Sequence, residues 1–271
     1  MTTESPAESY SPNDDGPTRI SARTLVVVPC YNEEKRLDTA AFLAALSQEQ
    51  NLEFVFVNDG SADGTQTILE EAARRGGPRV HLVALPENQG KAAAVRAGVL
   101  RAFELGAEII GYWDADLATP LAAIGAMSQA FRDPHILLVL GSRVQLLGRH
   151  IKRDPMRHFI GRGFATAVGL ALGMPVYDTQ CGAKLFRASP IMKRAFEESF
   201  EHVWTFDVEL LSRLLKEEAR AGTLHLSEQC VEFPLAAWHD KPGSKIRVTH
   251  VPRIAWEVIR FFVYSPRWSR R

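Results

Sequence analysis

The sequence contains little of what several common protein classes require. It has three cysteines in 271 residues, widely spaced and without a C-x-x-C pair. That excludes a disulfide framework and a structural zinc site, and it fits a reducing compartment. The longest nearly apolar segment, Phe164–Met174, is too short to span a bilayer, and no apolar secretory signal stands at the N-terminus. We therefore expect a cytoplasmic protein, either soluble or held peripherally at the inner face of a membrane.

The chain also lacks an excess of charge of either sign. It has 32 Lys and Arg against 32 Asp and Glu, which argues against nucleic acid as a partner of the whole molecule. The charge is unevenly spread, however. Residues 143–162 hold six Lys or Arg against one acid, and residues 238–271 hold eight against two. Such stretches suit an anionic ligand or an anionic membrane surface, although solvated loops can have the same composition.

Two phosphate-binding motifs are missing. No G-x-G-x-x-G follows the first apolar run, and Gly90-Lys91 lacks the first glycine and the Ser or Thr of a Walker A loop. Both absences argue against a Rossmann dehydrogenase and a P-loop NTPase.

What the sequence does contain is a regular alternation of short apolar runs and helical patterns. Continuous apolar strands between amphipathic helices predict an α/β fold with a Rossmann-like, mostly parallel sheet and helices on both faces. Ligands bind such sheets at the carboxyl ends of the strands. The expected strands are 24–30, 53–58, 80–85, 108–113 and 135–141, and the expected helices are 34–48, 64–75, 91–105 and 120–132.

The second half follows a different pattern. A basic loop leads to expected helices at 156–172 and 206–221, a strand at 224–233 and a last helix at 251–264. We divide the chain into a disordered tail (1–22), a first half that contains the regular alternation (23–142), a second half of the same domain (143–247), and a C-terminal amphipathic helix with a basic tail (248–271).

Polar residues follow the first three expected strands. After the first, Tyr31 offers a ring for a base, Asn32 could cap a helix and Glu33 could reach a ligand. After the second, Asp59 could accept a hydrogen bond from a ribose or a base. After the third, Lys91 would place a cation near phosphate at the start of a helix. The first two patterns are also typical of an ordinary helix cap and an Asx-rich turn.

Two carboxylates, Asp114 and Asp116, end the fourth expected strand. Residues two apart on a strand point the same way, and like charges held so close need a compensating cation or donor. A divalent cation shared with substrate phosphates would provide it, so we predict a divalent metal site held by Asp114 and Asp116. The alternative is a helix N-cap with a spare charge.

These motifs resemble those of family 2 glycosyltransferases. The likeness covers about Thr24 to Tyr264, and its second half is similar to the dolichyl-phosphate β-glucosyltransferase and dolichyl-phosphate mannosyltransferase branch, the glucosyl member more so. The motifs are Pro29-Cys30-Tyr31-Asn32-Glu33, Asn58-Asp59-Gly60-Ser61, Asn88-Gln89-Gly90-Lys91, Asp114-Ala115-Asp116 in the D-x-D form, Gly141-Ser142-Arg143, 178–184, 204–209, Trp238 and 242–245.

The resemblance implies a glycosyltransferase A fold, UDP-glucose or GDP-mannose as nucleotide-sugar donor, Mg²⁺ or Mn²⁺, a polyprenyl (dolichyl) phosphate acceptor and inversion at the sugar carbon. It makes residues 23–142 the nucleotide-sugar-binding half and residues 143–247 the acceptor-side half of the same domain. The eukaryotic glucosyl enzymes have an N-terminal membrane helix, where this sequence has a polar tail. The expected donor-binding residues are Pro29, Tyr31, Asn32, Glu33, Asp59, Lys91 and Asp114, and the expected catalytic residues are Asp116, Arg143, Lys184, Asp207 and Glu209.

The acceptor decides which further residues are needed. A phosphate monoester is largely ionised near neutral pH, with a second pKa of about 6, and needs cations to position it. The candidates are Arg143, Arg149, Arg153, Arg157 and Lys245. A hydroxyl acceptor would need a base, for which Asp207 and Glu209 are the candidates. Two alternatives stay open: a soluble sugar or small-molecule acceptor, and a catalytically silent nucleotide-sugar-binding module.

The last expected helix has an apolar stripe that includes Val251, Ile254, Val258 and Phe262, edged by Arg and Trp residues. Such a helix could lie in the interface of an anionic membrane or pack on the domain's own core.

Overall fold

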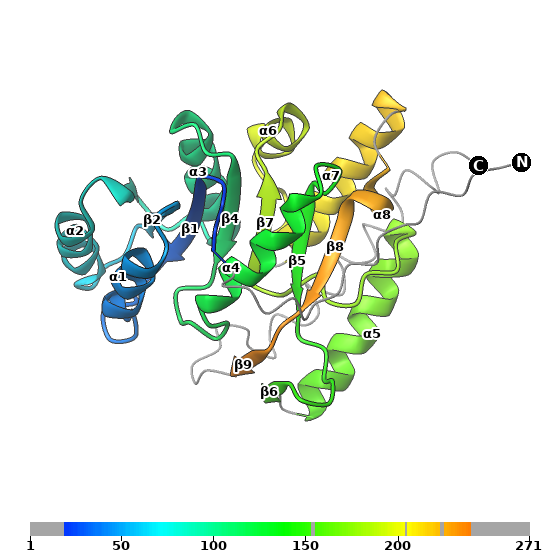
Figure 1. Cartoon of the computed structure of the whole chain (residues 1–271), viewed down its shortest axis with the longest axis horizontal. Helices are drawn as coiled ribbons and strands as arrows, with labels where there is room; N and C mark the ends of the chain where they lie inside the picture. Colours follow the sequence, from blue (N-terminus) through cyan, green and yellow to red (C-terminus); the bar gives the residue numbers. More distant parts are fainter. Residues whose placement is uncertain (1–18, 153–154, 204, 223–224, 240–271) are drawn as a thin grey trace, which may run out of the picture.

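A seven-stranded sheet forms the centre of the computed structural model (Figure 1), which describes residues 19–152, 155–203, 205–222 and 225–239, with backbone alone at 152, 155–160 and 221. The strand order is β3-β2-β1-β4-β7-β5-β8, and β7 alone runs antiparallel to its neighbours. The predicted mostly parallel sheet is therefore confirmed. Its strands are β1 (Thr24–Cys30), β2 (Leu52–Asp59), β3 (Val80–Leu85), β4 (Ile109–Trp113), β5 (Leu138–Ser142), β7 (Ala183–Arg187) and β8 (Cys230–Pro234).

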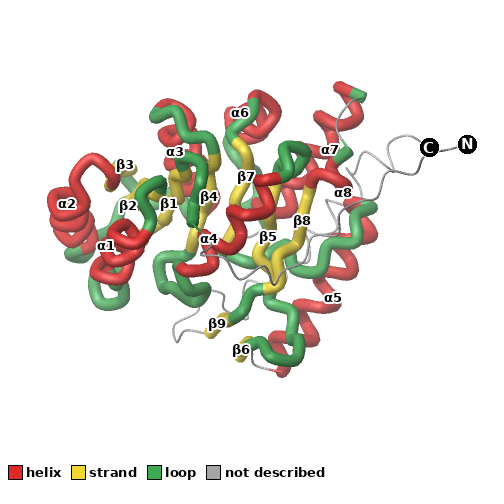
Figure 2. Tube along the Cα trace, in the orientation of Figure 1, coloured by secondary structure: helices red, strands yellow, loops and turns green. Residues whose placement is uncertain are grey.

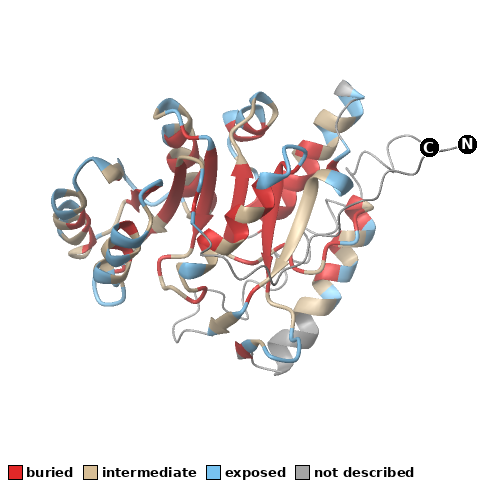
Figure 3. Cartoon of the chain, viewed as in Figure 1, coloured by how far each residue is buried: buried red, intermediate tan, exposed pale blue. Residues whose placement is uncertain are grey.

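Helices cover both faces of the sheet, as Figure 2 shows. Alternate residues of β1 divide between two core clusters, with Leu25 and Val27 in one and Val26 and Val28 in the other. This is the two-residue period of a strand buried on both faces (Figure 3). The first cluster takes side chains from α3 (Lys91–Glu104), α5 (Pro155–Leu172), α6 (Pro190–Glu197) and α7 (Phe206–Ala221), and the second from α1 (Thr39–Gln48), α2 (Thr65–Gly76) and α4 (Ala122–Ser128).

The structure differs from the prediction at several elements. Helix α1 begins at Thr39 rather than 34, because the Asp38 carboxylate accepts from Ala41 N–H and caps the helix there. The expected strand 224–233 was wrong in its first half, since α8 (Leu226–Gln229) precedes β8. Strand β7 and helix α6 were not predicted from the sequence. Short 3₁₀ turns follow α2 (Gly77–Arg79) and α4 (Gln129–Arg132).

A small parallel ribbon lies beyond the carboxyl ends of β5 and β8 (Figure 1). It pairs β6 (His150–Lys152) with β9 (Ala237–His239). The ribbon ties the loop after β5 to the segment after β8, two stretches that are far apart in the sequence.

Some expectations concern residues beyond those described. Arg153, Lys245, the side chain of Arg157 and the last expected helix (251–264) lie outside the described part of the chain. At the other end, ordered contacts begin before residue 22: Ile20 is buried and its N–H donates to Glu49. In the described segments, no helix is both long enough and apolar enough to cross a bilayer.

Candidate active site

Several predicted site residues meet at one edge of the sheet. Strands β1, β2, β3, β4 and β5 run in the same direction, so their carboxyl ends lie together, and antiparallel β7 starts at that edge. Asp59 ends β2, Asp114 follows β4, Arg143 follows β5, and Lys91 begins α3. The fold thus gathers charged residues from four separate motifs.

Asp59 is almost fully buried and holds the turn that precedes α3. Its carboxylate accepts from Gln89 N–H at 2.8 Å, from Gly90 N–H at 2.9 Å and from the Asn88 amide at 3.1 Å. Charge-assisted bonds of this kind fix backbone strongly. Asp59 therefore positions the residue that follows this turn, Lys91.

Lys91 and Asp114 form an ion pair, with 2.5 Å between Nζ and Oδ1. Burial alone would lower the pKa of Lys91, but the charges of Asp114 and Asp207 raise it above its ordinary value. Lys91 is thus a permanent cation at the carboxyl edge, and both partners keep over a third of their side-chain surface exposed. A ligand can therefore reach the pair.

Asp116 lies beside this pair and accepts from Ala118 N–H at 2.9 Å. Burial, and next the negative charge of Asp114, raises the pKa of the Asp116 carboxyl. Lys91 opposes that shift and Glu33 adds to it, so these four side chains share one electrostatic environment. The positive charge near Asp116 therefore does not fully compensate its carboxylate.

Gly182, which the sequence analysis did not single out, supports Asp114 from behind. Asp114 N–H donates to Gly182 O at 3.0 Å, and a Cβ on Gly182 would lie 1.8 Å from Asp114 Oδ2. The close approach is possible because β7 pairs with β4 and brings the 178–182 turn against the D-x-D segment. Without knowing that pairing, the sequence gives no signal for the contact.

Lys184 and Asp207 form a buried pair below the edge. Lys184 Nζ lies 2.7 Å from Asp207 Oδ1 and donates to Cys181 O at 2.6 Å, and the Tyr112 hydroxyl donates to the same Asp207 oxygen. Lys184 is 1% exposed. Burial and then Asp207 raise the pKa of Tyr112 well above its ordinary value, which keeps the hydroxyl a donor. Both residues were predicted to be catalytic, but their burial places them underneath the exposed Lys91–Asp114 pair.

Glu209, the second candidate base, is saturated with donors. Its oxygens accept from the backbone N–H groups of Glu201 and His202, from the His202 ring at 2.8 Å and from Arg213 at 2.7 Å. Burial opposes ionisation, but these donors, His202 first, lower the pKa of Glu209. A carboxylate held this way is a weak base. We assign it to anchoring the 201–202 turn.

Arg143 is held by a bidentate ion pair with Asp178, at 2.7 and 2.8 Å. Asp178 N–H in turn donates to Glu232 of β8, so the pair links β5, β8 and the 178–182 turn. Burial alone would lower the pKa of Arg143. Its hydrogen bonds and ion pair with Asp178 outweigh this effect and raise the pKa above its usual value. Among the described residues, Nη1 of Arg143 has no hydrogen-bond partner, so a fixed donor remains for a ligand.

A second arginine, not predicted from the sequence, lies close to Arg143. Arg162 of α5 stacks on the Tyr177 ring, 3.8 Å from its centroid. Arg143, Arg162 and Tyr177 line one small cavity of about 40 Å³. The basic composition of residues 143–162 does not distinguish Arg162 from the other cations of that stretch. Arg149, by contrast, lies in the loop after β5, with no ion pair to any described residue.

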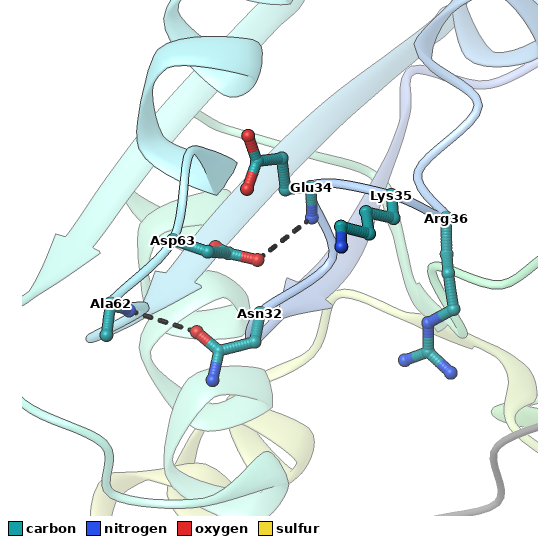
Figure 4. A pocket seen from close by; sticks show the side chains of 6 residues that line it. All are labelled: Asn32, Glu34, Lys35, Arg36, Ala62 and Asp63. Carbon is teal, nitrogen blue, oxygen red and sulfur yellow. Dashed lines mark hydrogen bonds between the residues drawn. The ribbon is translucent and has the colours of Figure 1, made fainter.

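The turn after β1 and the turn after β2 are joined by hydrogen bonds (Figure 4). Asn32 accepts from Ala62 N–H at 3.0 Å, and Asp63 accepts from Glu34 N–H at 3.2 Å. Lys35 and Arg36 extend beside these turns and help to line an open hollow. Tyr31 is half-buried next to it, and Glu33 is buried and paired with Arg36 at 2.7 Å. Of the predicted donor-binding residues that follow β1, Asn32 thus lines the polar hollow.

Asp114 and Asp116 offer the oxygen ligands that Mg²⁺ and Mn²⁺ prefer. The raised pKa of Asp116 fits the addition of a cation beside it. The described part of the chain contains no group of three or more His, Cys, Asp or Glu side chains arranged to hold a metal ion. A metal here would therefore need further oxygen ligands from a diphosphate and water, as is usual for Mg²⁺.

Comparison with known proteins shows the family to which the chain belongs. Residues 25–194 match glycosyl transferase family 2. The chain is 32% identical over 254 residues to a dolichyl-phosphate β-glucosyltransferase of Trichomonas vaginalis, covering 89% of this chain and 71% of that protein. It is also 32% identical to the mouse dolichyl-phosphate β-glucosyltransferase, covering 89% and 73%.

Solved structures show the same fold. Glucosyl-3-phosphoglycerate synthase of Mycobacterium tuberculosis, in complex with Mn²⁺, uridine diphosphate and glucosyl-3-phosphoglycerate, superposes with a TM-score of 0.63 at 17% identity, covering 97% of this chain and 85% of that one. A Pyrobaculum calidifontis mannosyltransferase with GDP-mannose and Mn²⁺ gives 0.57 at 20% identity, covering 91% and 67%. The predicted glycosyltransferase A fold is confirmed. The chain therefore belongs to glycosyl transferase family 2, in the branch of the dolichyl-phosphate β-glucosyltransferases.

Proposed function

We propose that this protein transfers a hexose, glucose in the first instance, from UDP-glucose to a polyprenyl or dolichyl phosphate, with inversion at the sugar carbon. The single observation that carries the proposal is the cluster of Lys91, Asp114 and Asp116 at the carboxyl edge. An exposed cation and two carboxylates there suit a nucleoside diphosphate and a divalent cation. We infer the lipid acceptor from the dolichyl phosphate in the names of the similar proteins.

In the proposed reaction, a phosphate oxygen of the acceptor bonds to the anomeric carbon of the sugar. The bond from that carbon to the diphosphate breaks on the opposite side, and UDP leaves with the electron pair. Lys91 stabilises the charge that develops on the diphosphate. Asp116 and Asp114 would hold Mg²⁺ or Mn²⁺, which when bound supplies Lewis-acid stabilisation of the same leaving group.

The acceptor phosphate is already an anion and needs no base to remove a proton. Arg143 and Arg162 line one cavity and can position it, Arg143 through its Nη1, which has no hydrogen-bond partner among the described residues. Arg149, Arg153, Arg157 and Lys245 remain proposed contributors. The surroundings of Asp207 and Glu209 also favour a phosphate acceptor over a hydroxyl that needs a base, because Asp207 is buried and paired with Lys184, and both oxygens of Glu209 accept hydrogen bonds.

The decisive experiment measures two products from radiolabelled UDP-glucose: free UDP and glucosylated lipid. It is run with and without a short-chain polyprenyl phosphate, and with Mn²⁺, Mg²⁺ or a chelator. We expect lipid product only with acceptor and metal, and GDP-mannose in parallel as a poor donor. Transfer to a soluble sugar phosphate but not to the lipid would favour the soluble-acceptor alternative. Binding of UDP-glucose with no product from any acceptor would indicate a silent binding module.

A further inference from the structure

The loop between β5 and β6 presents two leucines to solvent. Leu146 is 49% exposed and Leu147 is 105% exposed, as exposed as in an unfolded chain. With Leu170 of α5 they make up the exposed large hydrophobic side chains of the described residues. Single exposed leucines are ordinary, but two adjacent ones at a loop tip call for an explanation.

The loop is held in this shape by its own geometry. Arg149 N–H donates to Leu146 O at 3.1 Å, which closes a tight turn with Leu147 and Gly148 at its corners. Gly148 has a φ of +79°, as the third position of a type II turn requires. Leu147 therefore projects from the turn rather than folding back on the domain.

Both ends of the loop are fixed. At one end, Arg143 is locked to Asp178 by its bidentate ion pair. At the other end, His150 N–H donates to Ala236 O, and Ile151 is buried in the β6–β9 ribbon. The leucines are thus carried on a supported turn, and hiding them would mean breaking one of these attachments.

The sequence next to the turn carries mostly positive charge. Residues 144–153 contain Arg149, Lys152 and Arg153, and the acidic residue that follows them is Asp154, while Arg143 is neutralised by Asp178. Exposed leucines flanked by cations are the combination that binds an anionic lipid surface: the leucines enter the interface and the cations stay at the headgroups. A protein partner would not require this charge.

We propose that the Leu146–Leu147 turn inserts into an anionic bilayer and docks the carboxyl edge of the sheet on the membrane. This deepens the proposed function, on which it rests for its purpose. The turn follows Arg143 by three to four residues, a span of at most about 14 Å in extended chain. Docking would therefore keep an acceptor phosphate within reach of Arg143 while its lipid chain stays in the bilayer.

The test uses the full chain and vesicles of phosphatidylcholine with phosphatidylglycerol, at low salt and in about 1 M salt, where the Debye length falls to about 3 Å. High salt suppresses the contribution of basic segments and leaves the apolar one. We expect Leu146→Ser/Leu147→Ser to weaken high-salt vesicle binding by about tenfold or more, the scale of two partly buried leucines. Leu170→Ser, an exposed leucine at the far end of α5, is the matched control and should bind as wild type.

Vesicle binding that falls less than twofold in the double variant, or equally in the Leu170→Ser control, would overturn the proposal. A second result would also overturn it: a wild-type protein that is a dimer, and a double variant that is a monomer but binds vesicles as wild type does. The turn would then be a contact between two copies of the chain. The proposed function is tested separately, by measuring glucose transfer from UDP-glucose to a detergent-solubilised short-chain polyprenyl phosphate. If that transfer is absent and vesicle binding still depends on the leucines, the acceptor assignment fails and the membrane proposal stands.

Discussion

At the scale of single residues, the site depends on one close contact between backbone and carboxylate. Gly182 leaves no room for a side chain next to Asp114 Oδ2. Asp114 is more than a third exposed, so a new methyl group would push the carboxylate aside rather than unfold the domain.

We therefore expect Gly182→Ala to reduce kcat/KM for transfer by about tenfold to a hundredfold, the usual cost of misplacing a reacting or binding group by about 1 Å. The midpoint of thermal unfolding should change little. Gly163→Ala is the control, since a Cβ there meets nothing and alanine is the better helix residue. Wild-type kinetics in Gly182→Ala would show that Asp114 does not need this position.

Asp116 provides a second residue-scale prediction, with a defined sign. Its pKa is raised in the folded protein, by burial first and then by Asp114. Such a group stabilises the fold when protonated, and this stabilisation is lost as pH rises through the folded pKa. At neutral pH without metal, the ionised Asp116 therefore destabilises the protein, and a bound cation removes the penalty.

We expect Asp116→Asn to raise the metal-free unfolding temperature at neutral pH, to abolish transfer, and to lose the thermal stabilisation that Mn²⁺ gives the wild type. Lowering the pH should diminish that stabilisation in the wild type, because protons compete for Asp116. Asp133→Asn is a matched control: its carboxylate accepts from the N–H two residues later, as Asp116 does, but it lies just after the 3₁₀ turn Gln129–Arg132. A Mn²⁺ response retained by Asp116→Asn would remove Asp116 from the metal site.

At the scale of elements, the pairing of β7 with α7 depends on a buried charge. Lys184 of β7 lies directly opposite Tyr112 of β4, on the sheet face that α7 covers. Asp207 of α7 accepts from both side chains. Removing one member of a buried pair leaves the other charge uncompensated, which commonly costs about 3–5 kcal/mol.

Lys184→Met should therefore lower the free energy of unfolding by several kcal/mol, measured by urea denaturation. Lys184→Met/Asp207→Asn should recover much of it, since the remaining amide can still accept from Tyr112. If Lys184→Met keeps wild-type stability and loses only transfer, Lys184 acts in catalysis and our assignment to support is wrong.

The same elements show how far the sequence could predict the structure. Strands β1 and β3 were predicted with their observed bounds, because a short apolar run with clear turn residues at each end predicts a strand unambiguously. Helix α1 was predicted five residues too long, because the helical pattern continued through 34–38 while the cap at Asp38 decided the start. Local signals sufficed wherever the neighbouring strand was also the next one in the chain.

Antiparallel β7 could not be predicted this way. Its residues include Lys184 and Arg187, which break the apolar run, and the partners that bury Lys184 come from β4 and α7. The same limit applies to the prediction of the site residues. Asp114, Asp116 and Lys91 follow from strand-end chemistry, whereas Gly182 and Arg162 depend on long-range pairing. The hydrogen bonds that Asp207 and Glu209 accept could not be predicted from the sequence either.

At the scale of the whole molecule, attachment to a membrane could have two sources with different physics. The turn at Leu146–Leu147 is apolar and described, while the last predicted helix (251–264) and its basic tail lie outside the described residues. The basic contribution should fall steeply with salt, and the apolar contribution should not.

We therefore expect the full chain to sediment with anionic vesicles at low salt and to lose part of that binding as salt rises. Neutral vesicles should retain the salt-resistant part. A chain that does not bind anionic vesicles at low salt would contradict both membrane predictions. Deleting residues 251–271 separates the two readings of the last helix: a folded protein with weaker low-salt binding indicates an interfacial helix, and an insoluble one indicates a core helix.

The insertion of β7 between β4 and β5 also has a consequence for the order of folding. Parallel strands β1 to β4 lie within residues 24–113, but the free edge of β4 is covered only by residues 183–187. On the ribosome, an apolar strand edge must therefore wait about 70 residues for its partner, several seconds at ordinary synthesis rates. Nascent chains stopped before residue 183 should bind chaperones through β4, and ribosome-bound chains of increasing length would show protection of β4 appearing only once β7 has emerged.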